Sequence, residues 1–363
     1  MGTAGRIGRT RFFLSRMFAL GCMLALAAGC AGGPPLPTSA SPPPVRRTAD
    51  LLMFEQGDPA VAAPAKPSAA LLLVGGGEWP REGFRWWFEQ AGHGHVVILR
   101  ASFGGEHGDE MYRQIGGIAS ARTIVFHSRK GAFDPQVAEW LAGADAIFIS
   151  GGDQANYLRY WRDTPVQAAL NRHLAAGKPL GGTSAGLAIL GRYVYGALDG
   201  NSLTSAEILA RSDTPQATIA EDFLRAEPLY SAGVLTDTHF AIRKRQGRLI
   251  GMMAQIAQRH PGTPLLGLAV DEDAVMGIDA EGNGRVFSDV GDRVWLFHPG
   301  SATIAPGKPL QAQGWKITGL DGDSLLRTRD GWAVDRPAYL GQADVVDGII
   351  GYTPAWPAGQ GTR

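Results

Sequence analysis

The chain has 363 residues, of which 45% are apolar, and its 34 basic and 34 acidic side chains give a formal net charge of zero. The apolar share is ordinary for a soluble globular protein. The even charge balance argues against nucleic acid and anionic lipid surfaces as main partners, because both are bound through an excess of basic residues.

Residues 1–29 predict an export signal. Four arginines and no acid precede an apolar stretch over residues 17–29, which is too short for a permanent membrane span. The stretch ends in Leu-Ala-Ala-Gly-Cys, which resembles the bacterial lipoprotein signal and implies lipidation of Cys30. The protein would then be exported and anchored at the outer membrane, facing the periplasm or the exterior; ordinary cleavage and secretion is the alternative. Cys22 leaves with the signal, so the mature chain can form neither an internal disulfide nor a thiolate metal site.

Residues 30–67 are rich in proline and alanine and predict a flexible linker, interrupted by an apolar run at residues 51–54 that could dock on the folded domain. From residue 69 onward, short apolar runs alternate with stretches of helical spacing, which predicts a doubly wound α/β fold with a mostly parallel sheet. The expected strands cover residues 69–74, 95–99, 123–126, 146–149 and the run before Ser184. Because ligands bind beyond the carboxyl ends of such strands, we expect residues 75–77, residues 151–154 and Ser184 to line one crevice.

The second half of the chain has a looser pattern. Residues 191–221 are expected to form a loop that covers the substrate, followed by a helix over residues 243–256 and a buried strand over residues 265–270. We expect a catalytic domain over residues 68–300 and a small β-rich extension over residues 301–363.

The sequence Gly182-Thr183-Ser184-Ala185-Gly186 has the pattern G-x-S-x-G, between an apolar strand and a helical stretch. A serine on such a turn is exposed, and the N–H of the next residue, Ala185, points to the place where an oxyanion would form. The pattern therefore indicates a serine nucleophile.

A serine nucleophile needs a base and a group that orients the base. His239, His260 and His298 follow Ser184 in the chain, and His260 is expected at the surface. His239 lies just before three arginines whose guanidinium groups could together hold a substrate carboxylate, or could form a solvated helix face: Arg243, Arg245 and Arg248. Residues 271–273 are all acidic, and strand alternation places Glu272 opposite to Asp271 and Asp273.

Taken together, these motifs resemble those of the cyanophycinases, serine peptidases related to aspartyl dipeptidase. The match rests on four stretches in the same order: residues 151–154 (Gly-Gly-Asp-Gln), residues 182–186, residues 237–248 and residues 267–273. The resemblance implies a fold like that of class I glutamine amidotransferases, which is flavodoxin-like. It also implies that Ser184 is the nucleophile, His239 its base and Glu272 the orienting acid.

The resemblance further implies that the N–H groups of Gly152 and Ala185 form the oxyanion hole. It assigns substrate binding to Gln154, Asp237, Arg243, Arg245 and Arg248. The implied substrate is cyanophycin, a poly-aspartate with arginine on each side-chain carboxyl, or a related peptide with β-linked aspartate. Glu221 and Asp222 are candidates for holding the substrate guanidinium. No metal or organic cofactor is expected, the histidines of His93-Gly94-His95 are expected in a turn, and a homodimer is an open alternative for the assembly.

Two other functions stay open from the residues. An α/β-hydrolase has the order serine, acid, histidine, which would pair Ser184 with Asp271 or Asp273 and with His298 in an esterase. The chain could also be a non-catalytic, lipid-anchored binding protein on a peptidase scaffold.

Overall fold

The computed structural model describes residues 43–102 and 104–357. The predicted signal peptide, Cys30 and the first part of the predicted linker lie outside these residues. Among the described residues, no helix is both long and apolar enough to cross a bilayer.

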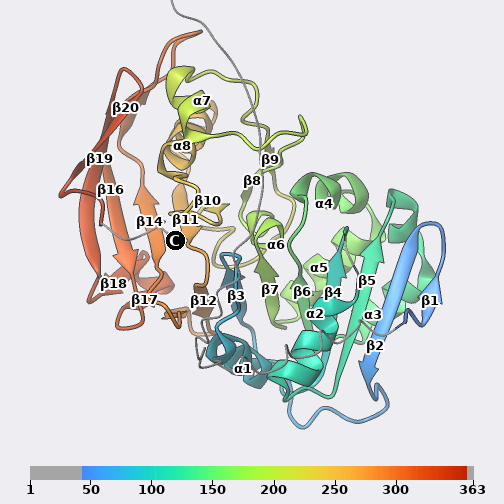
Figure 1. The fold of residues 1–363 in the computed structure, drawn as a ribbon. Helices are drawn as coiled ribbons and strands as arrows, with labels where there is room; N and C mark the ends of the chain where they lie inside the picture. The colour runs from blue at the N-terminus through green and yellow to red at the C-terminus, as the bar shows by residue number, and fades with distance from the viewer. Residues whose placement is uncertain (1–42, 103, 358–363) are drawn as a thin grey trace, which may run out of the picture. The chain divides into compact units, whose positions relative to one another are not determined.

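The first of two sheets contains the parallel strands expected from the apolar runs (Figure 1). Its parallel centre has the order β5-β4-β6-β7-β3, with β2 antiparallel at one side and β12 antiparallel at the other. In sheet order the strands are β1 (Arg46–Arg47), β2 (Leu51–Gly57), β5 (Ser120–Phe126), β4 (His95–Arg100), β6 (Ala146–Ile149), β7 (Leu180–Thr183), β3 (Leu71–Val74), β12 (Val275–Ile278), β13 (Asn283–Phe287), β17 (Leu325–Arg327) and β18 (Ala333–Asp335).

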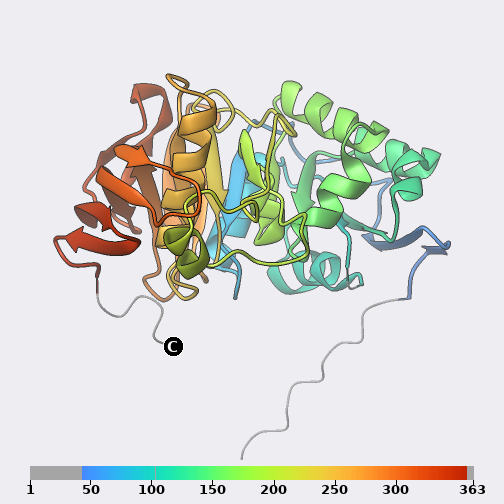
Figure 2. The same ribbon diagram turned by 90° about the horizontal axis from the view of Figure 1, so that it is seen from above.

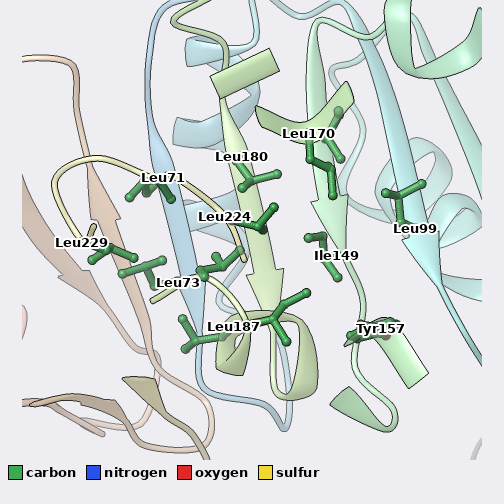
Figure 3. Close-up of a cluster of buried hydrophobic side chains, with 14 of the residues drawn as sticks. Leu71, Leu73, Leu99, Ile149, Tyr157, Leu170, Leu180, Leu187, Leu224 and Leu229 are labelled. Carbon is green, nitrogen blue, oxygen red and sulfur yellow. The ribbon is translucent and has the colours of Figure 1, made fainter. Parts of the chain in front are cut away.

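Helices cover both faces of this parallel centre (Figure 2), because its strands are apolar on both sides. Leu71 and Leu73 of β3 belong to a core with the helices α3 (Pro135–Ala142), α4 (Gln154–Trp161) and α5 (Pro165–Ala175). Figure 3 shows part of this core. Leu72 and Val74 face the opposite core, formed with α1 (Arg81–Gln90) and the π-helical turn η1 (Glu110–Ile115). The single turn α2 (Glu106–Asp109) directly precedes η1. A short 3₁₀ turn, η2 (Arg129–Phe133), leads into α3.

The second sheet has the order β20-β19-β16-β14-β11-β10-β8-β9, and β15 pairs with β16. Of its neighbouring pairs, β8–β10 and β10–β11 are parallel, and the others are antiparallel. One face is packed against α7 (Ser205–Ala210) and α8 (Gln246–Arg259), and the other face shares the core of the first sheet. The strands are β8 (Tyr193–Tyr195), β9 (Ile219–Glu221), β10 (Val234–Asp237), β11 (Leu266–Val270), β14 (Val294–His298), β15 (Ser301–Thr303), β16 (Gln311–Leu320), β19 (Tyr339–Val346) and β20 (Ile349–Thr353).

The structure differs from the expected domain limits at two places. Residues 51–57, inside the predicted linker, form β2, which pairs with β5 over seven residues and buries Leu51 and Met53. The expected C-terminal extension is not a separate appendage: β16 pairs with β14 in the second sheet, and β17 pairs with β13 in the first. Residues 328–330 between β17 and β18 form a 3₁₀ turn, η3 (Thr328–Asp330).

Candidate active site

The Ser184 turn is held by close backbone packing. Ser184 follows β7 and precedes the single helical turn α6 (Ala185–Ala188), with φ 51° and ψ −117°. A side chain at Gly182 would lie 2.7 Å from the backbone of Gly186, and one at Gly186 would lie 2.0 Å from the carbonyl oxygen of Ile149. Both glycines of the G-x-S-x-G pattern are therefore required by space, and the bend presents the serine at the end of the strand.

The structure brings Ser184, His239 and Glu272 into one chain of hydrogen bonds. Ser184 Oγ lies 2.8 Å from His239 Nε2, and His239 Nδ1 contacts Glu272 Oε1. The three residues follow the carboxyl ends of β7, β10 and β11, the first strand from one sheet and the other two from the second sheet. This arrangement is that of a nucleophile, a base and an orienting acid.

The His239 ring is fixed by its own backbone and by a glycine. His239 has φ 45°, and its N–H donates to the carbonyl oxygen of Gly75, 2.9 Å away, at the end of β3. A side chain at Gly76 would lie 2.2 Å from the imidazole. Gly75 and Gly76 therefore hold the base in place, but, among the described residues, residues 75–77 do not line the cavity at Ser184, contrary to expectation.

Burial lowers the pKa of His239, and the positive charge of Arg243 lowers it further, while the hydrogen bond to Glu272 raises it. The net direction is downward, so the imidazole is neutral at neutral pH. A neutral imidazole can accept the proton of Ser184, as a general base must.

Gly152 and Ala185 lie in the wall of a cavity of about 240 Å³ that opens at Ser184. A side chain built on the neighbouring Gly151 would lie 3.4 Å from Ser184 Cβ, so this loop runs directly beside the nucleophile. Within residues 43–102 and 104–357, the N–H groups of Gly152 and Ala185 have no intramolecular backbone acceptor. Such unpaired donors are suited to bind an oxyanion.

All three arginines line the cavity, but they make different contacts in the structure. Arg248 is buried and paired with the buried Asp237: its Nε donates to Asp237 Oδ2 at 3.0 Å and its Nη2 contacts Oδ1. Arg245 donates to the carbonyl oxygen of Thr238 at 2.7 Å, and burial lowers its pKa to about 10. Arg243 has a side chain that is 51% exposed and is the guanidinium most open to a ligand.

Asp237, which the resemblance assigns to substrate binding, lines the cavity and is paired with the two buried arginines, Arg245 and Arg248. Gln154 lines the cavity, as expected, and its side-chain nitrogen lies 3.4 Å from the carbonyl oxygen of Tyr195.

The acids proposed for the substrate guanidinium lie elsewhere. Glu221 is bonded to His260 at 2.8 Å, and Asp222 faces Arg192 at 3.6 Å. Besides the buried Asp237, the exposed Asp153 lines the cavity, and its Oδ1 also caps α4 by accepting from the N–H of Ala155. Asp153 lies in residues 151–154, which follow β6 and are expected in the crevice, so its place in the sequence could have indicated a role in substrate binding.

The residues of the esterase alternative do not meet Ser184. Asp271 is buried and accepts hydrogen bonds from Ala241 N–H, Arg293 N–H and Trp295 Nε1. Asp273 accepts from the N–H of Glu78, and His298 lies in β14 beside Lys316. Among the described residues, the cavity lining includes none of these three.

The predicted covering loop contains β8, α7 and β9 and contributes residues that the sequence did not single out. Tyr195, Asn201 and Ser202 line the cavity opposite Ser184. His93 and His95 are bonded to Gly117 and Ser120, and no group of three potential metal ligands occurs within residues 43–102 and 104–357.

The chain is similar to several known proteins. The model of peptidase family S51 matches residues 112–230. A cyanophycinase from Trichormus variabilis is 26% identical over 270 residues, covering 70% of this chain and 84% of the relative. A cyanophycinase from Synechococcus elongatus is 29% identical over 178 residues, covering 49% of each chain. A solved peptidase from an acI-B1 Actinobacterium is 17% identical, covers 72% of this chain and 97% of its own, and has a TM-score of 0.47.

The chain is a serine-type peptidase. More narrowly, it is similar to the cyanophycinases and, over residues 112–230, to peptidase family S51.

Proposed function

We propose that the protein hydrolyses cyanophycin, or peptides of the β-Asp-Arg type, through an acyl-enzyme on Ser184. The observation that carries the proposal is the hydrogen-bonded chain Ser184–His239–Glu272 at the mouth of a polar cavity. The cyanophycinases among the relatives support the substrate class.

In the proposed reaction, Ser184 Oγ attacks the scissile carbonyl carbon while its proton passes to His239 Nε2. The N–H groups of Gly152 and Ala185 bind the oxygen that becomes negative, and Glu272 stabilises the imidazolium that forms. When the tetrahedral intermediate collapses, the imidazolium protonates the leaving amine. Water, deprotonated by His239, then attacks the ester carbonyl, and the returning proton restores Ser184.

The cavity has charged groups of both signs, which supports a substrate with carboxylate and guanidinium groups. The exposed Arg243 is placed to bind a substrate carboxylate, and Asp153 to bind a substrate guanidinium. Asp237 and the two buried arginines, Arg245 and Arg248, line the same cavity and neutralise part of one another's charge.

Export is also part of the proposal and is supported by the sequence of residues 1–30. Lipidation of Cys30 would hold the enzyme at the outer membrane, where it would act on polymer outside the cytoplasm. Radiolabelled palmitate incorporated into wild-type protein and absent from Cys30→Ala would support this, and equal labelling would contradict it.

The activity is tested by incubating purified protein with cyanophycin and with β-Asp-Arg and identifying products by mass spectrometry. We expect products from the wild type and a loss of at least about 10³-fold in rate for Ser184→Ala and His239→Ala. His298→Ala is the matched control and should keep wild-type activity. Loss of activity in His298→Ala with full activity in His239→Ala would support the esterase arrangement instead. No labelling of Ser184 by a fluorophosphonate would support a binding protein.

A further inference from the structure

The hydroxyl of Tyr157 is buried behind the loop that follows β6. Tyr157 lies in α4, is fully buried and stacks on Trp161 with ring centroids 4.5 Å apart. Its hydroxyl lies 2.7 Å from the carbonyl oxygen of Ser150 and 3.0 Å from that of Gly151. Burial raises the pKa of Tyr157, so the hydroxyl keeps its proton and acts as a donor.

The Gly151 carbonyl belongs to the same peptide group as the Gly152 N–H. A trans peptide group is planar, and its C=O and N–H point in opposite directions. A donor that fixes the Gly151 carbonyl on one side therefore fixes the direction of the Gly152 N–H on the other side. The same hydrogen bond polarises the peptide group and strengthens its N–H as a donor.

The loop has little rigidity of its own at this point. Gly152 has φ 141°, in a region that glycine alone enters freely, and Gly151 has no side chain to restrict it. The start of the loop is fixed separately, since Ser150 N–H donates to Leu99 and Ser150 Oγ lies 2.8 Å from His107 Nδ1. The peptide between Gly151 and Gly152 is thus the part that depends on the tyrosine.

We propose that Tyr157 is a positioning residue for the oxyanion hole: its hydroxyl holds the Gly151–Gly152 peptide so that the Gly152 N–H faces the Ser184 site. The role assigned to Gly152 rests on the proposed function. The tyrosine touches no substrate and acts through the peptide group alone.

The test is Tyr157→Phe, which removes the hydroxyl and keeps the ring in the core. We expect kcat on cyanophycin to fall about 10- to 100-fold with KM changed less than about threefold, because the oxyanion forms only after substrate is bound. A peptide boronate, whose tetrahedral adduct places an oxygen in the hole, should bind more weakly by a similar factor. A fluorophosphonate should label Ser184 more slowly by a similar factor.

Tyr160→Phe is the matched control, since Tyr160 lies on the same helix and packs half-buried against the same core. It should leave kcat, boronate affinity and labelling rate within about twofold of the wild type. The proposal is overturned if Tyr157→Phe keeps wild-type labelling and boronate affinity, or if it raises KM with kcat unchanged.

Two further measurements cover the cases in which Tyr157→Phe does not fold or cyanophycin is not the substrate. If Tyr157→Phe does not fold by circular dichroism, 4-aminophenylalanine at position 157 supplies a weaker donor; labelling slowed more than twofold supports the proposal, and an unchanged rate overturns it. If the wild type does not cleave cyanophycin, the proposed substrate is wrong, but the labelling and boronate measurements still test Tyr157.

Discussion

At the residue scale, the pKa of His239 predicts the pH dependence of Ser184 reactivity. The neutral imidazole is the base, and burial keeps its pKa below the ordinary value of 6.5, so reactivity should persist as the pH falls below that value. The rate of fluorophosphonate labelling between pH 4 and 9 measures the acid limb of the pH profile, where protonation of His239 abolishes reactivity. The charge of a substrate does not affect this measurement. An acid limb centred above pH 6.5 would contradict the prediction.

Arg243 contributes to this lowered pKa through its positive charge. Arg243→Gln should therefore move the acid limb of labelling upward, by roughly 0.3 to 0.5 pH unit, because the charge that is removed is half exposed and partly screened by solvent. Arg327→Gln is the control, because Arg327 pairs with Asp335 on β18 and does not line the cavity. A downward shift in Arg243→Gln would mean that the arginine acts on the site in another way.

Asp237 should matter for stability as well as for the site. Asp237→Ala leaves the guanidinium of Arg248, 3% exposed, without its anion, and we expect a loss of about 3–5 kcal/mol in the free energy of unfolding. In Asp335→Ala the broken pair is half exposed on both sides, so the loss should be about 0–1 kcal/mol. Chemical denaturation compares the two, and equal losses would show that Asp237 is not structural.

The contrast between Ser184 and Arg248 shows what the sequence can and cannot predict about this site. The nucleophile can be predicted from the sequence because the turn needs glycines at fixed positions beside the serine. The roles of the arginines cannot be predicted in this way, because they depend on which guanidinium the fold places against Asp237. The pairing depends on how the end of β10, which carries Asp237, packs against the start of α8, which carries Arg248. Composition and spacing do not determine this packing.

At the scale of elements, β2 predicts that the folded unit begins well before residue 68. Met53 is fully buried in the main core, so Met53→Ala should cost about 2–5 kcal/mol in the free energy of unfolding. Val45, 60% exposed beside β1, is the control, and Val45→Ala should stay within about 0.5 kcal/mol. A negligible effect of Met53→Ala in chemical denaturation would mean that residues 51–57 are a tether after all.

The parallel strands could be predicted because each is an uninterrupted apolar run, which is the pattern of a strand that is buried on both faces. For β2, the apolar run at residues 51–54 indicated a segment that could dock on the domain, but the surrounding Pro- and Ala-rich composition indicates a linker and gave no sign of a strand in the sheet. Its position beside β5 depends on tertiary packing, because Leu51 and Met53 become buried when β2 pairs with the edge of the sheet.

At the scale of the described unit, residues 43–102 and 104–357, the two sheets share one core and the last sixty residues complete both. Leu268 and Leu296 of the second sheet lie in the same apolar cluster as Leu71 and Leu73 of the first. Trp356, near the end of the described chain, packs on Trp295 of β14 with ring centroids 4.2 Å apart. The sequence indicated β structure here but not which sheets the strands would join.

A chain that ends at residue 300 should therefore fail to fold. It would expose β14 where β16 pairs with it over five residues, and β13 where it pairs with β17. Because the carboxyl end of β11, next to β14, carries Glu272, the site should be lost with the sheet. We expect low soluble yield and no fluorophosphonate labelling of Ser184. Ile349→Ala in the full chain, at a side chain 75% exposed on β20, should keep both. A soluble, labelled chain ending at residue 300 would mean that the strands after β14 are dispensable, and that the Ser184 site is held by the central parallel strands alone.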